Sequence, residues 1–402
     1  MIEKEYEVPV IMYHSIGVPN KNWIWNYLTC PFEAFEQQLI AIKEKGLTTI
    51  SLNQLHDYMV KSKPIPSKSI VLTFDDGYAD IWVFAYPLLK KYDMCGTVFI
   101  NPEFVDKRGG FKTHYANNGQ IDGLDGDGFL SWDEIKKMDE EGVVFSESHA
   151  LTHTWYPISN KIIDFRHPED SYTWMTWNGN TDLKHSLQID NKTLANLGQP
   201  VYEHEKSLMA KKCFIDLKLE KHIVDYVANN GKEAFFNKKN WRDILTSQVE
   251  MYNEGNDFEP TYESDEDYFQ RIEFELKSTK VILEEKLNRK ITFLCWPGGS
   301  ATKKGMEIAL SLGYQLFNSA RDMSKSQRKM IKNVQGGGIR VKRFTPLIYF
   351  NQEENFNSKI KYANKFWMKL YLYRFLNKPF SKVIFKFCTI VANAYYKKIL
   401  KY

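Results

Sequence analysis

Two carboxylates and two imidazoles stand at positions where they can do chemistry together. Asp75 and Asp76 directly follow one short apolar run, and His149 and His153 follow another. Both runs are typical of buried parallel strands. If these strands are neighbours in one sheet, their carboxyl ends meet at the same edge. The sequence therefore predicts that the four side chains converge there.

Two imidazole nitrogens and one carboxylate oxygen suit a divalent metal and leave an open position for a water that the metal makes acidic. We therefore expect a metal-dependent hydrolase with a divalent cofactor, Zn²⁺ before other first-row transition metals. Residues four apart share one face of a helical turn, so His149 and His153 are expected on such a turn. Neighbours at a strand end point apart, so only one of Asp75 and Asp76 should bind the ion. The other carboxylate is then free to act as a base.

Each motif also has an ordinary structural interpretation. The Asp-Asp-Gly string at residues 75–77 is typical of a turn, because aspartate caps backbone groups and glycine accepts unusual dihedral angles. A histidine pair four residues apart is common on surface helices. The occurrence of both motifs at strand exits favours the functional interpretation.

Composition limits the class of protein. The chain has 402 residues, of which 43% are hydrophobic, enough for a large core in one big domain or in two to three small ones. Its five cysteines are scattered and form no Cys-x-x-Cys pair, which favours a reducing compartment. The acidic first residues show no secretory signal. We therefore expect a cytoplasmic protein, peripheral to the inner face of the membrane, with a secreted or cell-surface location by another route as the alternative.

Short apolar runs alternate with amphipathic segments, which is typical of repeated βα units. The strand count predicts a closed or nearly closed α/β barrel, where chemistry gathers at the carboxyl ends of strands. We expect strands at residues 8–13, 48–52, 69–74, 96–101, 143–145, 291–296 and 314–317. We expect helices at residues 32–45, 53–60, 79–91, from 131 onward, 268–287 and 303–312.

Four segments are expected along the chain. Residues 1–154 and 268–350 form the two parts of the barrel, residues 155–267 a largely helical insertion, and residues 355–402 a basic, aromatic, helical tail. Because the insertion begins directly after His153, it can wall or cap the substrate groove. A helical decoration on the flank of the barrel is the alternative.

Several of these strings match a known family in order. They are Pro-Val-Ile-Met-Tyr-His-Ser at 9–15, Val-Leu-Thr-Phe-Asp-Asp-Gly-Tyr at 71–78, the histidine pair, and the segments at 293–299 and 312–314. The chain resembles the polysaccharide deacetylase superfamily, the NodB homology domain of carbohydrate esterase family 4. It is most similar to the poly-N-acetylglucosamine deacetylase-like branch. This resemblance covers most of residues 8–103, 129–154 and 270–345 and implies a distorted (β/α)7-type barrel.

The resemblance also implies roles. Asp75 is the general base, and the metal is held by Asp76, His149 and His153. No histidine follows His222, so the late histidine acid of many members is missing, and the resembled branch points to His14 instead. Substrate and oxyanion contacts fall to Tyr78, Trp296 and Pro297. The arginine that orients the base in many members is absent from its usual place, and Arg340 or Arg343 is expected to substitute.

The implied substrate is an N-acetylated amino-sugar glycan, in a polysaccharide or linked to a lipid or nucleotide, with acetyl, formyl or another acyl group. Two other functions stay open: a glycosidase that uses paired carboxylates, and a non-catalytic carbohydrate-binding relative. Residues 355–402 contain eleven basic residues and no acidic one. They are expected either to contact an anionic membrane peripherally or to dock on the barrel with solvated lysines. A nucleic-acid partner is not expected, because no recognition motif accompanies the charge.

Overall fold

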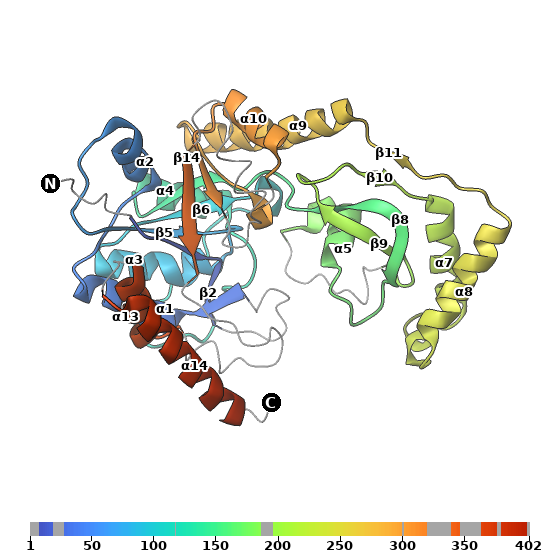
Figure 1. The fold of residues 1–402 in the computed structure, drawn as a ribbon, viewed down its shortest axis with the longest axis horizontal. Helices are drawn as coiled ribbons and strands as arrows, with labels where there is room; N and C mark the ends of the chain where they lie inside the picture. The colour runs from blue at the N-terminus through green and yellow to red at the C-terminus, as the bar shows by residue number, and fades with distance from the viewer. Residues whose placement is uncertain are drawn as a thin grey trace.

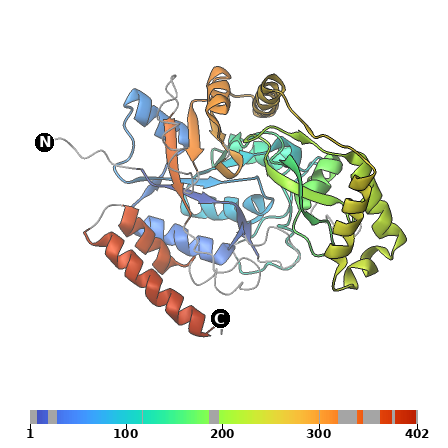
Figure 2. The same ribbon diagram turned by 45° about the vertical axis from the view of Figure 1, so that its right-hand side comes forward.

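The fold is built on a barrel of parallel strands (Figures 1 and 2). The structure is a computed structural model and describes residues 8–18, 28–116, 118–185, 196–299, 301–319, 339–345, 363–375 and 379–399. The strands run in the order β1, β14, β13, β12, β7, β6, β5, with β4 also beside β5. Their bounds are β1 (Val10–Tyr13), β4 (Thr48–Thr49), β5 (Ser69–Phe74), β6 (Gly96–Ile100), β7 (Val144–Ser148), β12 (Phe293–Cys295), β13 (Leu316–Ser319) and β14 (Ile339–Phe344).

The pairing of β1 with β5 closes this order into a ring of seven strands. The ring is uneven: β1 pairs with β5 over four residues, whereas β7 and β12 share one pair, Leu294 with Ser148. The predicted distorted seven-stranded α/β barrel is therefore confirmed. Its last strand, β14, lies in a segment where the sequence analysis expected no strand.

Helices cover the outside of the barrel. They are α1 (Phe32–Glu44), α2 (Leu52–Lys61), α3 (Tyr86–Tyr92), α4 (Trp132–Glu140), α9 (Asp265–Leu287) and α10 (Lys303–Ser311). Helix α4 begins as its sequence predicts, because the Ser131 side chain accepts from the backbone of Glu134 while the Glu134 side chain accepts from the backbone of Ser131. Helix α3 is preceded by a π-helical stretch, Ile81–Ala85, which explains why the sequence placed the start of this helix too early.

The barrel strands are apolar throughout because both of their faces are covered. All six residues of β5 and all five of β6 are buried. Between the strands and the helices lies the main core, to which Phe35, Leu72, Phe84 and Ile272 belong. Burying each such side chain stabilises the fold by about 1.5–3 kcal/mol. The scaffold beneath the carboxyl ends of the strands is thus a packed and rigid layer.

The segment between β7 and α9 forms a unit to one side of the barrel (Figure 1). It contains the predicted helices, but it also contains a long antiparallel strand pair, β8 with β9, that the sequence analysis did not single out. Leu219, Ile223, Trp241 and Leu245 pack with Phe165 in a core of its own. The elements are β8 (Trp155–Phe165), α5 (Thr173–Gly179), β9 (Pro200–Lys206), β10 (Cys213–Phe214), α7 (Leu217–Asn229), α8 (Trp241–Glu254) and β11 (Thr261–Tyr262).

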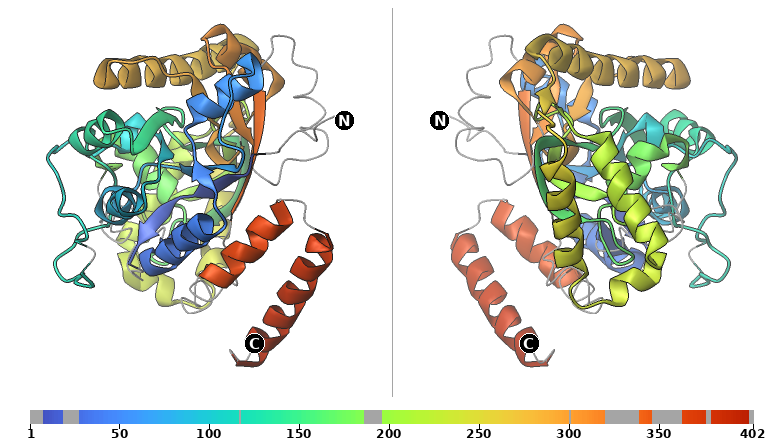
Figure 3. Two further views of the ribbon diagram at one scale, coloured as in Figure 1. Left: turned by 90° about the vertical axis from the view of Figure 1, so that its left-hand side faces the viewer. Right: turned by 90° about the vertical axis from the view of Figure 1, so that its right-hand side faces the viewer.

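The tail forms two helices, α13 (Lys365–Phe375) and α14 (Ser381–Ile399), that make a hairpin at one flank of the barrel (Figure 3). Helix α13 is docked: Trp367 and Tyr371 belong to the main core, and Lys365 and Lys369 both pair with Glu44 of α1. The docked alternative therefore holds for this helix. Among the described helices, none is both long enough and apolar enough to cross a bilayer.

Candidate active site

The end of β5 delivers two adjacent carboxylates to the carboxyl edge of the barrel. The backbone N–H of Asp75 donates to the carbonyl oxygen of Tyr13 at 3.0 Å, which extends the β1–β5 ladder by one residue. The backbone then turns, with φ of 72° at Asp76 and 76° at Gly77. The positive φ and a Cβ position 2.9 Å from Cδ1 of Ile100 both favour glycine at residue 77. The turn aims the two carboxylates at different partners.

The two histidines lie on an irregular loop after β7, so the expectation of a helical turn was wrong. Ala150 has φ of 60° and His153 has φ of 42°, the left-handed region that non-glycine residues seldom adopt. The side-chain amide of Asn101 donates to the carbonyl oxygens of His149 and Ala150. Although the loop is not helical, its backbone directs both imidazoles toward the same point.

A buried carboxylate on α9 holds the same loop from the other side. Glu275 accepts from the backbone N–H of Thr152 at 3.2 Å and from its hydroxyl at 2.7 Å. The ammonium group of Lys184, from the insertion, donates to the carbonyl oxygen of Thr152 at 3.0 Å and also pairs with Glu103. Every polar group of Thr152 is thereby satisfied, which offsets the strain at the neighbouring His153.

Asp76, His149 and His153 meet in a geometry that fits a metal ion. Oδ1 of Asp76 lies 3.1 Å from Nε2 of His149 and 3.5 Å from Nε2 of His153. A tetrahedral ion with bonds of about 2.0–2.1 Å holds its ligand atoms roughly 3.3 Å apart. Nδ1 of His149 lies 2.7 Å from the carbonyl oxygen of Cys295 and must donate to it, so the Nε2 lone pair faces Asp76. These three residues can therefore hold a divalent metal.

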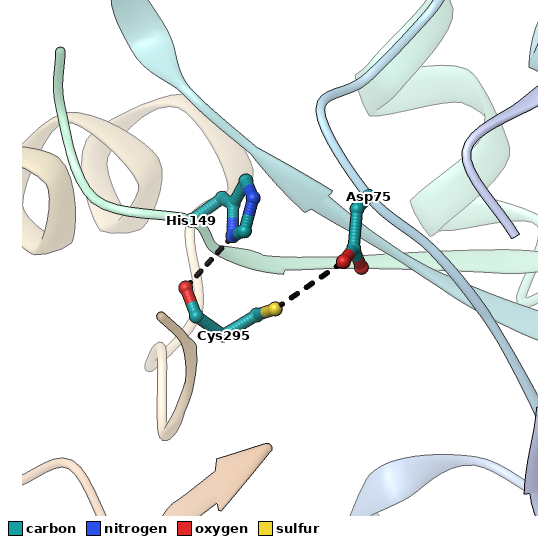
Figure 4. A group of neighbouring side chains, drawn as sticks. All are labelled: Asp75, His149 and Cys295. Carbon is teal, nitrogen blue, oxygen red and sulfur yellow. Dashed lines mark hydrogen bonds between the residues drawn. The ribbon is translucent and has the colours of Figure 1, made fainter. Parts of the chain in front are cut away.

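Asp75 forms a buried, bidentate ion pair with an arginine from β14. The Arg343 guanidinium donates to both carboxylate oxygens, at 2.5 and 2.8 Å, and both side chains are almost fully buried. It also donates to Sγ of Cys295 at 3.0 Å, and this thiol lies 3.6 Å from Asp75 (Figure 4). Asp75, His149 and Cys295 form a second cluster of ligand atoms. Because both oxygens of Asp75 are already bonded to Arg343, the cluster with Asp76 is the better metal site.

Electrostatics sets the protonation states in this site. Burial raises the pKa of the Asp75 carboxyl, but the positive charge and hydrogen bonds of Arg343 outweigh burial and hold that pKa below its ordinary value. Burial acts on Asp76 in the same way, and the neighbouring histidines lower its pKa on balance. Burial lowers the pKa of His153 to about 4 against the attraction of Asp76. Burial lowers the pKa of His149, but Cys295 and the contact with Asp76 outweigh burial and raise that pKa, so a metal ion would displace a proton from His149 on binding.

The other predicted residues lie at different distances from this centre. Nε2 of His14 lies 4.0 Å from Oδ2 of Asp75. Tyr78 and Trp296 are buried and line the same pocket, whereas Pro297 is buried and does not line it. Of the two candidate arginines, the structure brings Arg343 to Asp75. Arg340 lies on the same strand, β14, but its side chain is outside the described residues.

These groups open into one pocket of about 480 Å³, a size typical of small-ligand sites. Several residues that line it were not among the site residues predicted from the sequence, namely Asn101, Phe104, Trp155, Trp177 and Lys206. Asn101 follows β6, so the rule of strand ends could have found it. Lys206 carried no such signal, because its strand belongs to the insertion. The insertion therefore walls part of the pocket.

Residues 62–193 match the family model described as polysaccharide deacetylase. YxkH of Bacillus subtilis (strain 168) is 30% identical over 151 residues, 38% of this chain and 45% of YxkH. The poly-beta-1,6-N-acetyl-D-glucosamine N-deacetylase of Staphylococcus aureus (strain MRSA252) is 28% identical over 167 residues, 39% of this chain and 51% of that protein. The chain thus spans about half the length of these relatives. The solved structure of IcaB from Ammonifex degensii is 16% identical, with a TM-score of 0.47, over 91% of this chain and 98% of IcaB.

Proposed function

From the polysaccharide deacetylase domain that this chain carries, we propose that the protein is a metal-dependent hydrolase that removes an N-acyl group from an amino sugar. One observation supports this most strongly. A three-ligand metal site, Asp76 with two histidines, shares a pocket with a second carboxylate, Asp75, that is held by an arginine. This is the set of groups that hydrolysis of an amide by water needs.

The metal would be held by Asp76, His149 and His153. When bound, a divalent ion supplies Lewis acidity, which polarises a carbonyl and lowers the pKa of water. The donor set of two nitrogens and one oxygen suits Zn²⁺, and other first-row ions share this preference. Zinc is therefore the ion to test first.

The remaining steps belong to residues of the chain. Asp75 accepts the proton of the attacking water, and the bidentate bond from Arg343 keeps its carboxylate in one orientation. His14, which follows β1 and has its Nε2 4.0 Å from Oδ2 of Asp75, is assigned the proton donation to the leaving amine. The backbone next to Tyr78 and the rings of Tyr78 and Trp296 are assigned the contacts to the acyl group.

The paired-carboxylate glycosidase finds less support in this pocket. Asp75 and Asp76 are the carboxylates that line it in the described part of the chain. Arg343 occupies both oxygens of Asp75, and the histidines engage Asp76. A glycosidase acid needs a raised pKa, whereas both of these carboxyls have lowered pKa values.

The substrate class follows from named relatives. Since matched proteins of Staphylococcus aureus and Escherichia coli are named poly-beta-1,6-N-acetyl-D-glucosamine N-deacetylases, we propose an N-acetylated glucosamine glycan as the substrate. Acetate release from N-acetylglucosamine oligomers tests the proposal. We expect release by the zinc-loaded protein, loss with Asp75→Asn or a chelator, and no change with the exposed control Asp182→Asn. Sugar binding without acetate release would favour the non-catalytic alternative, and chain cleavage that survives a chelator would favour the glycosidase.

We also propose that helix α14 lies on an anionic membrane surface. Its solvent-exposed side carries apolar residues beside the exposed Lys382 and Lys386. These apolar residues are Val383, Ile384, Phe387, Ile390, Val391 and Tyr395. A helix with apolar and basic sides suits the interface of an anionic bilayer. A cytoplasmic location on that membrane remains a prediction for cell fractionation.

Liposome flotation tests this contact. We expect the protein to float with vesicles that contain anionic lipid, and Phe387→Glu to reduce that fraction severalfold. Phe274→Glu is a matched control, because Phe274 on α9 is 62% exposed and Phe387 is 66% exposed. Equal flotation of both variants would contradict the proposal.

A further inference from the structure

The pocket contains a cation that the hydrolytic steps do not use. Lys206 is the last residue of β9, pairs with Trp155 of β8, and lines the pocket together with the metal-binding residues. Its side chain is half-buried. Within the described ranges, no carboxylate pairs with its ammonium group. An ammonium group that lines a pocket without a paired carboxylate can donate its hydrogen bonds to an anionic ligand.

The backbone that carries Lys206 is firmly anchored beside the metal-binding loop. The N–H of Ser207 donates to the carbonyl oxygen of Thr154 at 2.8 Å, and its hydroxyl reaches Glu275 at 3.4 Å. Glu275 is the carboxylate that also holds the loop between the histidines. Arg271 donates to the carbonyl oxygen of Ser207. Glu275 therefore contacts both the backbone segment that carries Lys206 and the loop that carries His153.

The stem of Lys206 crosses the turn after β12. A Cβ on residue 298 would lie 2.6 Å from Cε and 3.2 Å from Nζ of Lys206, and Gly298 has φ of +52°. Only glycine lets the lysine pass so close to this backbone. The insertion thus reaches the barrel at this point, and Lys206 lines the pocket beside Gly298.

The charges of the pocket favour an anion. Its lining includes two carboxylates, Asp75 and Asp76, and two permanent cations, Arg343 and Lys206. A bound divalent ion therefore leaves an excess of positive charge in a site with low-dielectric walls, which attracts anionic ligands. Since Arg343 is committed to Asp75, Lys206 is the cation in this pocket that can meet a ligand.

We propose that Lys206 binds an anionic substituent, a phosphate or a carboxylate, on the same amino sugar whose acyl group is removed. This inference rests on the proposed function and narrows the substrate class to acidic amino sugars. Lysine binds such groups as a point charge with three donors. Lys206 is then a specificity residue, and the insertion selects the substrate.

Kinetics with matched sugars test this assignment. The probes are N-acetylglucosamine, its 1-phosphate, its 6-phosphate and N-acetylmuramic acid, whose carboxylate separates the two anion types. We expect the wild-type protein to prefer at least one anionic probe. Lys206→Met should raise KM for that probe roughly 10- to 100-fold, the loss of a hydrogen bond to a charged group, and leave KM for the neutral sugar within about twofold.

Two further variants sharpen the result. Lys206→Arg keeps the charge and should retain most of the preference, and Lys161→Met, an exposed lysine on β8, should behave as wild type. Equal losses for neutral and anionic probes, or no preference in the wild type, would overturn the proposal. Calorimetric binding of the same probes distinguishes the two proposals. Anion-dependent binding that Lys206→Met abolishes, without acetate release, would support the anion site while the deacylation proposal fails.

Discussion

Arg343 and Asp75 provide a prediction that does not depend on any activity. Their side chains are 3% and 5% exposed, and the guanidinium donates to both carboxylate oxygens. We consider Arg343→Met, which keeps an apolar stem but removes the charge, Asp75→Asn, and the double variant. Each single variant leaves one partner buried without its counter-charge.

The structure sets the expected magnitudes. Removing one partner of a buried ion pair costs about 3–5 kcal/mol of unfolding free energy. In Asp75→Asn the guanidinium keeps two weaker partners, the Thr73 hydroxyl at 3.3 Å and Sγ of Cys295 at 3.0 Å. The loss of unfolding free energy in this variant should therefore lie at the lower end of that range. The double variant buries neither charge. We therefore expect the double variant to lose about 2–3 kcal/mol less unfolding free energy than the two single variants lose together.

Urea unfolding at pH 7 with a chelator present measures this cycle, because bound metal would otherwise add its own stabilisation. Lys221 and Asp225 form an exposed pair on α7 and provide the control cycle. Its coupling should be no more than about 0.5 kcal/mol. Additive costs for Arg343 and Asp75 would refute the reasoning that their pairing offsets the burial of both charges.

Three further predictions concern pH, metal binding and the histidine loop. Burial raises the pKa of Asp80 to about 7, so the folded state binds this proton more tightly than the unfolded state and stability falls as pH rises from about 4 to 7. Asp80→Asn should remove that part of the pH dependence, as urea midpoints at pH 5 and pH 8 will show; an unchanged dependence would contradict it. His153→Ala should lower zinc affinity by more than the roughly 10–100-fold that losing an outer partner costs, measured by competition with a chromophoric chelator. Glu275→Ala leaves both donors of Thr152 without an acceptor and should cost about 2–4 kcal/mol, with Glu275→Gln closer to wild type; equal costs would argue against the bonds to Thr152.

Much of the barrel could be predicted because its signals are local. The buried runs of β5 and β6, the capping box at Ser131 and the strand-end positions of Asp75 and His149 depend on residues a few positions apart. The long β8–β9 pair could not be predicted in this way. Its register joins Trp155 to Lys206, residues far apart in the sequence, and no local pattern marks such a pairing.

The predicted metal ligands were found from local signals, but their arrangement depends on contacts between distant residues. Asp76, His149 and His153 do come together, but the reason given for the two histidines was wrong. Their loop is held by Asn101 and Glu275 from two other elements, and it adopts left-handed backbone conformations that local propensity disfavours. The four-residue spacing suggested that the two histidines act together, whereas hydrogen bonds from residues distant in the sequence bring them together.

The amino-acid sequence by itself determined the chemistry available here: which groups can bind a metal, and which strand ends carry them. The tertiary structure decided that Arg343 pairs with Asp75, that helix α13 docks on the barrel, and that a lysine from the insertion lines the pocket. The physical reason is that residue type and short-range periodicity are written along the chain. Contacts between distant segments depend on how whole elements pack, and no single stretch of sequence encodes them.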